Sequence, residues 1–198
     1  TSGGISGVHH GNKNQFTTAS TETSDLWNND RINTVSIVTR HDAHAQQVID
    51  ALNSGKNVFV EKPLALTLAE LEEIDRAYHQ ANKSDTIRLM VGFNRRYAPH
   101  VVKMKKLLES HRSPKSIIMT VNAGAIPGEH WVQNTLIGGG RIIGEGCHFI
   151  DLMRHLVGHK ITNFQAMMMG NVPGVEVRED KASITLSFED GSFGTIHY

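Results

Sequence analysis

Hydrophobic and polar positions follow one pattern up to about residue 94. Short apolar runs at 35–39, 58–60 and 89–93 alternate with segments in which apolar residues recur at helical spacing. Strand–helix–strand alternation of this kind is typical of a parallel sheet with helices packed on it. The pattern predicts one helix over 45–52, which Gly55 ends, and a second that begins after Thr67.

The second of these helices carries its own start signal. Thr67 and Glu70 have the spacing of a capping box, in which the hydroxyl and the carboxylate satisfy free N–H groups of the first turn. Four side chains at helical spacing are expected to form its buried stripe: Leu71, Ile74, Tyr78 and Ala81.

The pattern changes after residue 95. A basic amphipathic helix is expected over 99–110, with five apolar side chains directed inward: Val101, Val102, Met104, Leu107 and Leu108. Strand-like runs then dominate, at 117–121, 161–169, 182–188 and 192–198. Asp190-Gly191 predicts a hairpin between the last two runs.

One helix, over 146–157 and closed by Gly158, interrupts these strands. We therefore expect an α/β chain. Residues 1–94 would form an incomplete Rossmann parallel sheet, the partial dinucleotide-binding domain. Residues 95–198 would form a partial α+β domain with a mostly antiparallel sheet, for substrate and oligomerisation.

Composition narrows the classes of function. The chain has 20 Lys and Arg against 20 Asp and Glu, whereas a protein that binds a nucleic-acid backbone needs a basic excess, so no nucleic-acid partner is expected. The single cysteine, Cys147, excludes an internal disulfide and a cysteine-rich zinc site. The sequence has neither an apolar run of about 18 residues nor a leader-like start. We expect a cytoplasmic protein with no membrane partner.

Candidate chemistry lies where strands end, because ligands bind at the carboxyl ends of parallel strands. Segment 39–41 follows the first apolar run, and Glu61-Lys62-Pro63 follows the second. Pro63 keeps Lys62 extended, so its amine is expected to project over the sheet edge, where it can orient or protonate a substrate oxygen. The structural alternative is a surface pair of Glu61 and Lys62.

A second candidate is the glycine-rich segment 138–146 with the helix that follows it. His148, Asp151 and His155 lie at i, i+3 and i+7 on one face of that helix. A histidine beside an acid suits proton transfer near neutral pH. A flexible loop followed by a polar interface fits the same residues equally well.

Together these segments resemble a known family. Glu61-Lys62-Pro63, the segment 92–96 (Gly-Phe-Asn-Arg-Arg), and the triple glycine followed by His148 and Asp151 occur in the order and spacing of Gfo/Idh/MocA oxidoreductases. The resemblance covers essentially the whole chain. It implies a Rossmann domain followed by a domain on a large, mostly antiparallel sheet, NAD or NADP as cofactor, and a homo-oligomer formed through the C-terminal sheet.

The resemblance also implies residue roles. Lys62 and His148 would be catalytic. The cofactor would contact Thr39, Arg40, His41, His44, Glu61, Lys62, Asn94 and Arg95, and His44 would also cap the following helix. The substrate would contact Trp131, Glu145 and Asp151.

One position departs from the family pattern. Many members have an aspartate four residues before the histidine, where this chain has Gly144. Glu145 is the nearest acid, but a one-residue offset turns a side chain by about 100° around a helix.

A narrower resemblance is to the oxidoreductase half of bacterial bi-domain proteins that carry an alcohol-dehydrogenase-like module. It rests on four segments: 39–41, 121–124, 130–133 and 140–145. The G-x-G-x-x-G fingerprint that holds a cofactor's pyrophosphate is absent from the sequence. We therefore expect a fragment that begins after the second Rossmann strand, with Thr1 and Ser2 near the adenosine ribose, and that binds nicotinamide cofactor poorly.

The interpretation is an NAD(P)-dependent oxidoreductase that transfers hydride between nicotinamide and a hydroxyl or carbonyl carbon of a sugar, sugar derivative or cyclitol. One alternative is a non-catalytic relative that binds a nucleotide or a partner, which Gly144 favours. Another is a metal-dependent hydrolase that uses the pairs His41/His44 and His155/His159. Neither pair has a third ligand at an obvious spacing, so no metal is expected.

Overall fold

Two β-sheets organise the chain, and the computed structural model describes residues 4–170, 173 and 181–198. The first sheet has three strands in the order β1-β2-β3, and the second has four in the order β4-β7-β6-β5. The strands are β1 (Thr34–Ile37), β2 (Asn57–Val60), β3 (Leu89–Val91), β4 (Ser116–Thr120), β5 (Ile161–Met168), β6 (Ala182–Phe188) and β7 (Phe193–His197). Thr1 and Ser2, expected near the adenosine ribose, lie outside the described residues.

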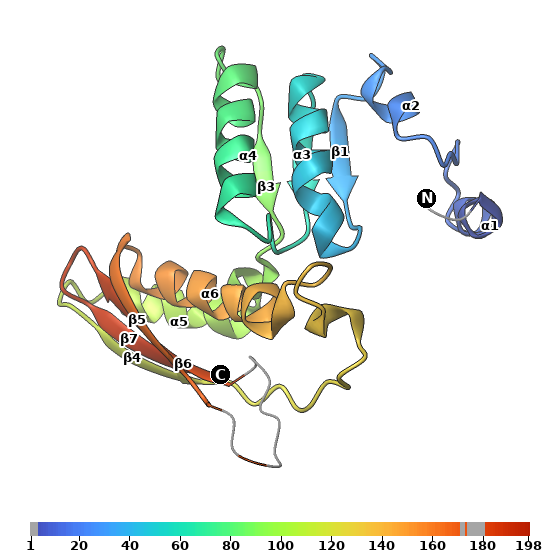
Figure 1. Cartoon of the computed structure of the whole chain (residues 1–198). Helices are drawn as coiled ribbons and strands as arrows, with labels where there is room; N and C mark the ends of the chain where they lie inside the picture. Colours follow the sequence, from blue (N-terminus) through green and yellow to red (C-terminus); the bar gives the residue numbers. More distant parts are fainter. Residues whose placement is uncertain (1–3, 171–172, 174–180) are drawn as a thin grey trace.

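The described residues contain six α-helices. They are α1 (Gly4–Lys13), α2 (Ser24–Trp27), α3 (His44–Asn53), α4 (Leu68–Ala81), α5 (Pro99–Glu109) and α6 (Cys147–Val157). Of these, α1 and α2 extend away from the sheets on the β1 side (Figure 1). The sequence pattern did not predict α1 or α2. Three glycines in α1, which are poor helix formers, explain why its pattern was missed. No helix in the described part of the chain is long and apolar enough to cross a membrane.

The first sheet is parallel, as predicted, and packs against α3 and α4. Strands β1 and β2 bury alternate side chains, which meet the buried faces of the two helices: Val48, Ala51 and Leu52 of α3, and Ile74 and Ala77 of α4. Complete burial of a side chain of this size contributes roughly 1.5–3 kcal/mol. This packing fixes the carboxyl ends of the strands, and with them the loops that leave the sheet.

Helix α4 begins where the sequence predicts. The N–H of Glu70 donates to Oγ1 of Thr67 at 3.2 Å, and the Glu70 carboxylate accepts from the N–H of Thr67 at 2.9 Å. The expected stripe was wrong at Leu71, which is 40% exposed. Leu71 borders an open hollow beside Leu64 and Leu89, where no other element covers it in the described residues.

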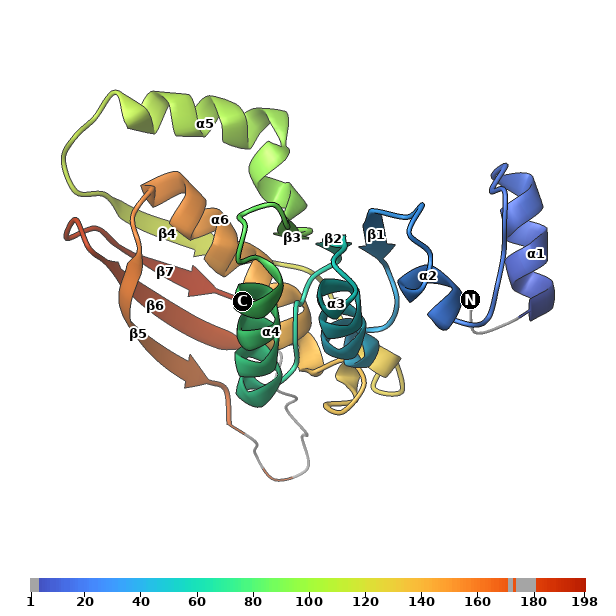
Figure 2. The same cartoon turned by 90° about the horizontal axis from the view of Figure 1, so that it is seen from above.

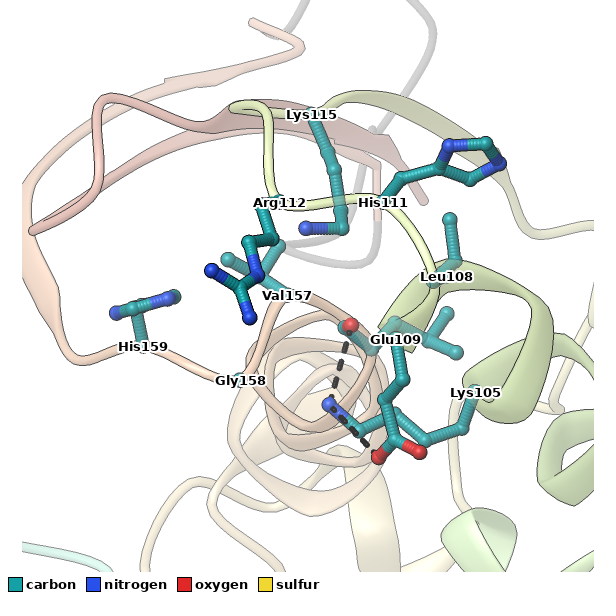
Figure 3. A pocket seen from close by; sticks show the side chains of 10 residues that line it. Lys105, Leu108, Glu109, His111, Arg112, Lys115, Val157, Gly158 and His159 are labelled. Carbon is teal, nitrogen blue, oxygen red and sulfur yellow. Dashed lines mark hydrogen bonds and ion pairs between the residues drawn. The ribbon is translucent and has the colours of Figure 1, made fainter.

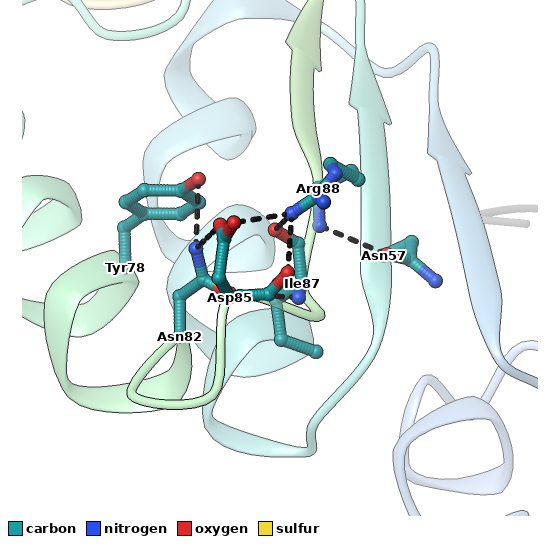
Figure 4. A network of polar contacts seen from close by, with 6 residues as sticks. All are labelled: Asn57, Tyr78, Asn82, Asp85, Ile87 and Arg88. Carbon is teal, nitrogen blue, oxygen red and sulfur yellow. Dashed lines mark hydrogen bonds and ion pairs between the residues drawn. The ribbon is translucent and has the colours of Figure 1, made fainter.

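Polar contacts fasten the turn between α4 and β3 to the neighbouring strand (Figure 4). Oδ1 of Asn82 accepts from the N–H of Ile87 at 2.7 Å, and the Arg88 guanidinium donates to the backbone oxygen of Asp85 at 2.8 Å. The N–H of Arg88 donates to Oδ1 of Asn57 at 2.9 Å. Because Asn57 begins β2, this network holds β3 in place beside it.

The second sheet is mixed. The β5–β6 and β6–β7 pairings are antiparallel, as predicted, and β4 pairs with β7 in parallel. The β6–β7 turn is the expected hairpin, with Gly191 in the left-handed region at φ 82°. Alternate residues of β6 pack against α6, which covers one face of this sheet (Figure 2).

Helix α5 lies against α6 (Figure 2). Of the five side chains expected to face inward, Val101 and Leu108 are half-buried, whereas Val102, Met104 and Leu107 are exposed. The expectation was wrong for these three residues because α5 packs beside a single helix and not across a sheet. No residue of α5 is buried.

Candidate active site

Lys62, two residues after β2, reaches across to the glycine-rich turn before α6. Its Nζ donates to the backbone oxygen of Gly144 at 2.6 Å and to Oε1 of Glu145 at 2.9 Å. The Lys62 side chain is 14% exposed and that of Glu145 is 35% exposed. Lys62 therefore pairs with a residue 83 positions away, and the alternative of a surface pair with Glu61 is wrong.

The backbone of the glycine-rich turn places Glu145 at this contact. Residues Ile142–Gly146 form a π-helical turn that leads directly into α6, and such turns recur at functional sites. Burial would raise the pKa of Glu145. The hydrogen bond and charge of Lys62, together with His148 and Arg95, instead hold that pKa below its ordinary value. Glu145 is thus an anion paired with Lys62.

His148 lies in the first turn of α6 and is 5% exposed. Burial lowers its pKa, and the charges of Lys62 and Arg95 lower it further against the opposing effect of Glu145. Its Nδ1 is buried and has no hydrogen-bond partner among the described residues. A buried nitrogen without a hydrogen bond lowers the stability of the folded chain. Its presence leaves one ring position available to a proton or a ligand.

Glu61 and the segment after β3 lie beside this group. A Cβ on Gly92 would lie 3.1 Å from Oε2 of Glu61, so glycine at this position leaves room for the carboxylate. Asn94 is exposed, and the Arg95 guanidinium lies over the Phe149 ring, 4.6 Å from its centre. Glu61, Asn94 and Arg95 therefore lie at the carboxyl ends of β2 and β3.

The loop after β1 contributes Thr39 and Arg40. Oγ1 of Thr39 donates to Oε1 of Gln47 at 3.0 Å. The Arg40 guanidinium lies 5.7 Å from the centre of the Trp131 ring. The loop is thus in contact with Trp131, the residue expected to contact substrate.

His44 does not cap α3, and that expectation was wrong. Ala43 occupies the N-cap, and His44 is the first helical residue. The fully buried ring of His44 lies between two carbonyl oxygens, with Nδ1 2.7 Å from Pro63 and Nε2 3.1 Å from Thr39. It ties the loop after β1 to the Lys62-Pro63 turn.

His41 is also buried, and its Nδ1 donates to the backbone oxygen of Gly138 at 2.8 Å. Its ring meets Trp131 edge to face at 4.8 Å. Burial and the nearby charge of Lys62 lower its pKa, although the Gly138 carbonyl acts in the opposite direction. Within the described residues, no group of three His, Cys, Asp or Glu side chains is arranged to hold a metal.

Asp151 contacts Arg96, whose guanidinium donates to both of its carboxylate oxygens. The Asp151 side chain is 9% exposed and that of Arg96 is 30% exposed. The pair joins α6 to the short helix at Asn94–Tyr97. Sequence reasoning missed this role of Arg96, although its place beside Asn94 and Arg95 was the available signal.

The glycines before the π-helical turn pack against other parts of the chain. A Cβ on Gly138 would lie 2.3 Å from Cα of Val132, and one on Gly139 would lie 2.6 Å from Cδ2 of Leu66. These glycines thus allow the loop to lie close to segment 131–132 and to the residues after Pro63.

A separate hollow lies at the opposite end of α6 (Figure 3). Lys105 donates to the backbone oxygen of Leu156 at 3.5 Å, and its Nζ lies 3.9 Å from the Glu109 carboxylate. A cation at this position offsets the partial negative charge of the helix C-terminus. This hollow is not part of the group around Lys62.

Two family descriptions together match most of the sequence. Residues 9–93 match an oxidoreductase family described as having an NAD-binding Rossmann fold, and residues 101–198 match the GFO/IDH/MocA C-terminal domain. The chain belongs to the Gfo/Idh/MocA oxidoreductase family.

Relatives of this Gfo/Idh/MocA chain include dehydrogenases named for inositols. The chain is 31% identical over 171 residues to scyllo-inositol 2-dehydrogenase (NAD(+)) of Bacillus subtilis, covering 83% of this chain and 48% of the relative. It is 26% identical over 175 residues to myo-inositol 2-dehydrogenase of Thermotoga maritima, covering 87% and 51%. The chain spans about half the length of the curated relatives it matches.

A solved Gfo/Idh/MocA-like structure has the same fold. Levoglucosan dehydrogenase, in complex with NADH and levoglucosan, aligns with a TM-score of 0.83 and 25% identity, over 100% of this chain and 55% of that one. The α/β fold with a parallel three-stranded sheet and a mixed four-stranded sheet is therefore that of known oxidoreductases.

Charged side chains from the loops after β2 and β3, Lys62 and Arg95, lie close enough to His148 to lower its pKa. The Nδ1 of His148 has no hydrogen-bond partner among the described residues, so this edge of the parallel sheet, where ligands bind in such folds, offers a polar atom to a ligand. The sequence contains no G-x-G-x-x-G segment for the pyrophosphate.

Proposed function

We propose that the whole protein is a dehydrogenase that uses NAD or NADP and acts on a sugar, sugar derivative or cyclitol. One observation carries the proposal. At the carboxyl ends of parallel strands, the paired ammonium of Lys62 lies near the buried imidazole of His148, whose pKa is lowered and whose Nδ1 has no hydrogen-bond partner among the described residues. Proton transfer and orientation of an oxygen need these two kinds of group.

Each residue has a defined task in this proposal. Lys62 orients the reacting oxygen by a charged hydrogen bond, and His148 takes the hydroxyl proton during oxidation and returns it during reduction. When bound, the nicotinamide accepts or supplies the hydride. The residues that would hold it are Thr39, Arg40, His41, His44, Glu61, Lys62, Asn94 and Arg95, with the fully buried ring of His44 acting by holding the loop after β1. Those that would face the substrate are Trp131, Glu145 and Asp151.

The substrate class is inferred from chemistry and from the relatives. The group around Lys62 combines a cation, carboxylates and an aromatic ring, which together suit a ring that bears several hydroxyl groups. The matched relatives are named for inositols and for levoglucosan. These names support a polyhydroxylated ring as the substrate class.

A turnover assay tests the proposal. The full-length gene product is incubated with NAD or with NADP and a panel of inositols, anhydrosugars and aldoses, and the absorbance of reduced nicotinamide at 340 nm is followed. We expect steady reduction with at least one ring polyol. Binding of cofactor without turnover of any compound would contradict the proposal.

That second outcome is expected of the alternative function, a non-catalytic regulatory relative. Gly144, in place of the acid common in the family, is the observation that favours it. Lys62 and His148 disfavour it, because a group able to transfer a proton lies near one able to orient an oxygen, and regulation alone requires neither.

Several further assignments belong to the same proposal. We propose a cytoplasmic protein with a domain boundary between residues 94 and 95, in which an alcohol-dehydrogenase-like module belongs to the same polypeptide. We also propose a homo-oligomer formed through the second sheet, because Ile118, Met167 and Phe193 are exposed apolar side chains on its strands. The flanking gene sequence tests whether an alcohol-dehydrogenase-like module is present, and light scattering of the full-length protein tests the homo-oligomer.

A further inference from the structure

His41 fastens the loop after β1 to the glycine-rich segment. Its Nδ1 donates to the backbone oxygen of Gly138 at 2.8 Å, and the neighbouring N–H of Asp42 donates to the backbone oxygen of Ile137 at 3.1 Å. A carbonyl oxygen can only accept, so Nδ1 carries a proton and the tautomer of the neutral ring is fixed. The imidazole is 8% exposed and therefore held in one place.

The same ring fills the space where a side chain on Gly144 would lie. An ideal Cβ on Gly144 would be 3.1 Å from Cε1 and 3.5 Å from Nδ1 of His41, and 3.4 Å from the Gly138 oxygen. Gly144 is buried, and its φ is not in the left-handed region. The space left by His41, and not backbone conformation, therefore favours glycine at this position, because a Cβ there would push the ring or the turn by a few tenths of an ångström.

Gly144 in turn holds Lys62. Its backbone oxygen is the nearer of the two acceptors of the Lys62 ammonium, at 2.6 Å against 2.9 Å for Glu145. A displacement of Gly144 by a few tenths of an ångström would be transmitted to the amine, because a charged hydrogen bond of this length depends strongly on its geometry.

We propose that His41 is a positioning residue for Lys62, acting through Gly144, and that His41 and Gly144 are a matched pair. This inference rests on the proposed function only in assuming that Lys62 acts on the substrate oxygen. It goes beyond contact with cofactor, since it assigns to His41 the placement of an amine in the substrate region.

The variants isolate this contact. His41→Ala removes the ring, His41→Asn keeps a donor toward the Gly138 carbonyl, and Gly144→Ala adds the Cβ. Gly146→Ala is the matched control, because Gly146 is buried in the same π-helical turn but its Cβ would meet Ile142 at an ordinary 3.6 Å.

The first readout is the ammonium signal of Lys62 in ¹H–¹⁵N spectra of the full-length protein, identified by its loss in Lys62→Arg. We expect this signal in the wild type, in His41→Asn and in Gly146→Ala, and its loss or displacement in His41→Ala and Gly144→Ala. A Lys62 signal unchanged in both of the latter variants overturns the proposal.

The second readout is the midpoint of thermal unfolding. We expect Gly144→Ala to lower it by about 3–6 °C, Gly146→Ala to leave it within ~1 °C, and His41→Ala with Gly144→Ala to lose less than the sum of the single changes. Additive losses, or equal midpoints for the two glycine variants, overturn the proposal. Should His41→Ala not fold, the comparison of Gly144→Ala with Gly146→Ala decides.

Neither readout depends on turnover. If the full-length protein shows no dehydrogenase activity while the Lys62 signal responds to His41, the proposed function fails and the coupling stands. If the protein is active and the signal does not respond, only the coupling fails.

Discussion

The ammonium of Lys62 and the carboxylate of Glu145, 2.9 Å apart, join the loop after β2 to the turn before α6. The pair brings a strand end of the parallel sheet to the helix that covers the mixed sheet. It also places opposite charges near His148, and their effects on this ring can be measured separately.

The pKa of His148 should move in opposite directions when the two charges are removed. The positive charge of Lys62 lowers that pKa and the negative charge of Glu145 raises it. We expect Lys62→Met to raise the pKa of His148 and Glu145→Gln to lower it, measured by NMR titration of the ring protons. Lys83→Met, which changes an exposed lysine, should have no effect. Shifts of equal sign in the two test variants would contradict this assignment of charges.

Stability should fall as the solution becomes acidic. The pKa values of His41 and His148 lie below 6.5 in the folded chain, so below pH 6.5 the unfolded chain binds protons that the folded chain does not. The contribution of Glu145, whose pKa is lowered, is lost only below about pH 4.5. We expect the free energy of unfolding in urea to decline from about pH 6.5 downward. Equal values at pH 7.5 and pH 5.5 would oppose this account.

Cys147 should react slowly although it lies beside Lys62 and His148. Burial raises the pKa of its thiol to about 11, so roughly 1 molecule in 1,000 carries the reactive thiolate at pH 8. We expect iodoacetamide to alkylate the folded chain far more slowly than the same chain in guanidinium chloride, as followed by mass spectrometry. Equal rates in the two conditions would show that the thiol is neither buried nor protonated.

The buried ring of His44 should contribute substantially to the free energy of unfolding. His44→Ala leaves the carbonyl oxygens of Thr39 and Pro63 without this partner and opens a cavity. We expect a loss of about 2–3 kcal/mol in unfolding free energy, measured in urea. His79→Ala, which changes an exposed histidine on α4, is the control and should cost little. Equal effects of the two substitutions would show that the ring does not hold the two loops together.

The sequence allowed prediction of those parts of the fold that depend on local pattern. Apolar periodicity and the Thr67–Glu70 capping box located the parallel strands and α4, because such signals lie within a few residues of one another. Periodicity shows which face of a helix is apolar, but it does not show how much of that face other elements of the fold pack against. Leu71 and Leu107 were therefore expected to be buried, and the structure shows them exposed.

The sequence allowed a set of candidate residues to be named but not their contacts. Lys62 follows a strand and His148 lies at the start of a helix, both of which the pattern located, and the resemblance gave both residues their expected roles. The contact of Lys62 with Glu145 depends on a π-helical turn, which has no sequence signal. The packing of His41 on Gly144 joins residues about 100 positions apart and became visible only in three dimensions.

The initial rate of cofactor reduction in the full-length protein tests the central claim most directly, with wild type, Lys62→Ala, His148→Ala and the exposed-site control Lys83→Ala compared on one ring polyol. The control should match wild type. The two site variants should lose at least 100-fold in kcat/KM, the order of magnitude that one acid–base or positioning group supplies, while retaining a folded thermal transition. Near wild-type rates in both site variants would show that neither Lys62 nor His148 takes part in the reaction.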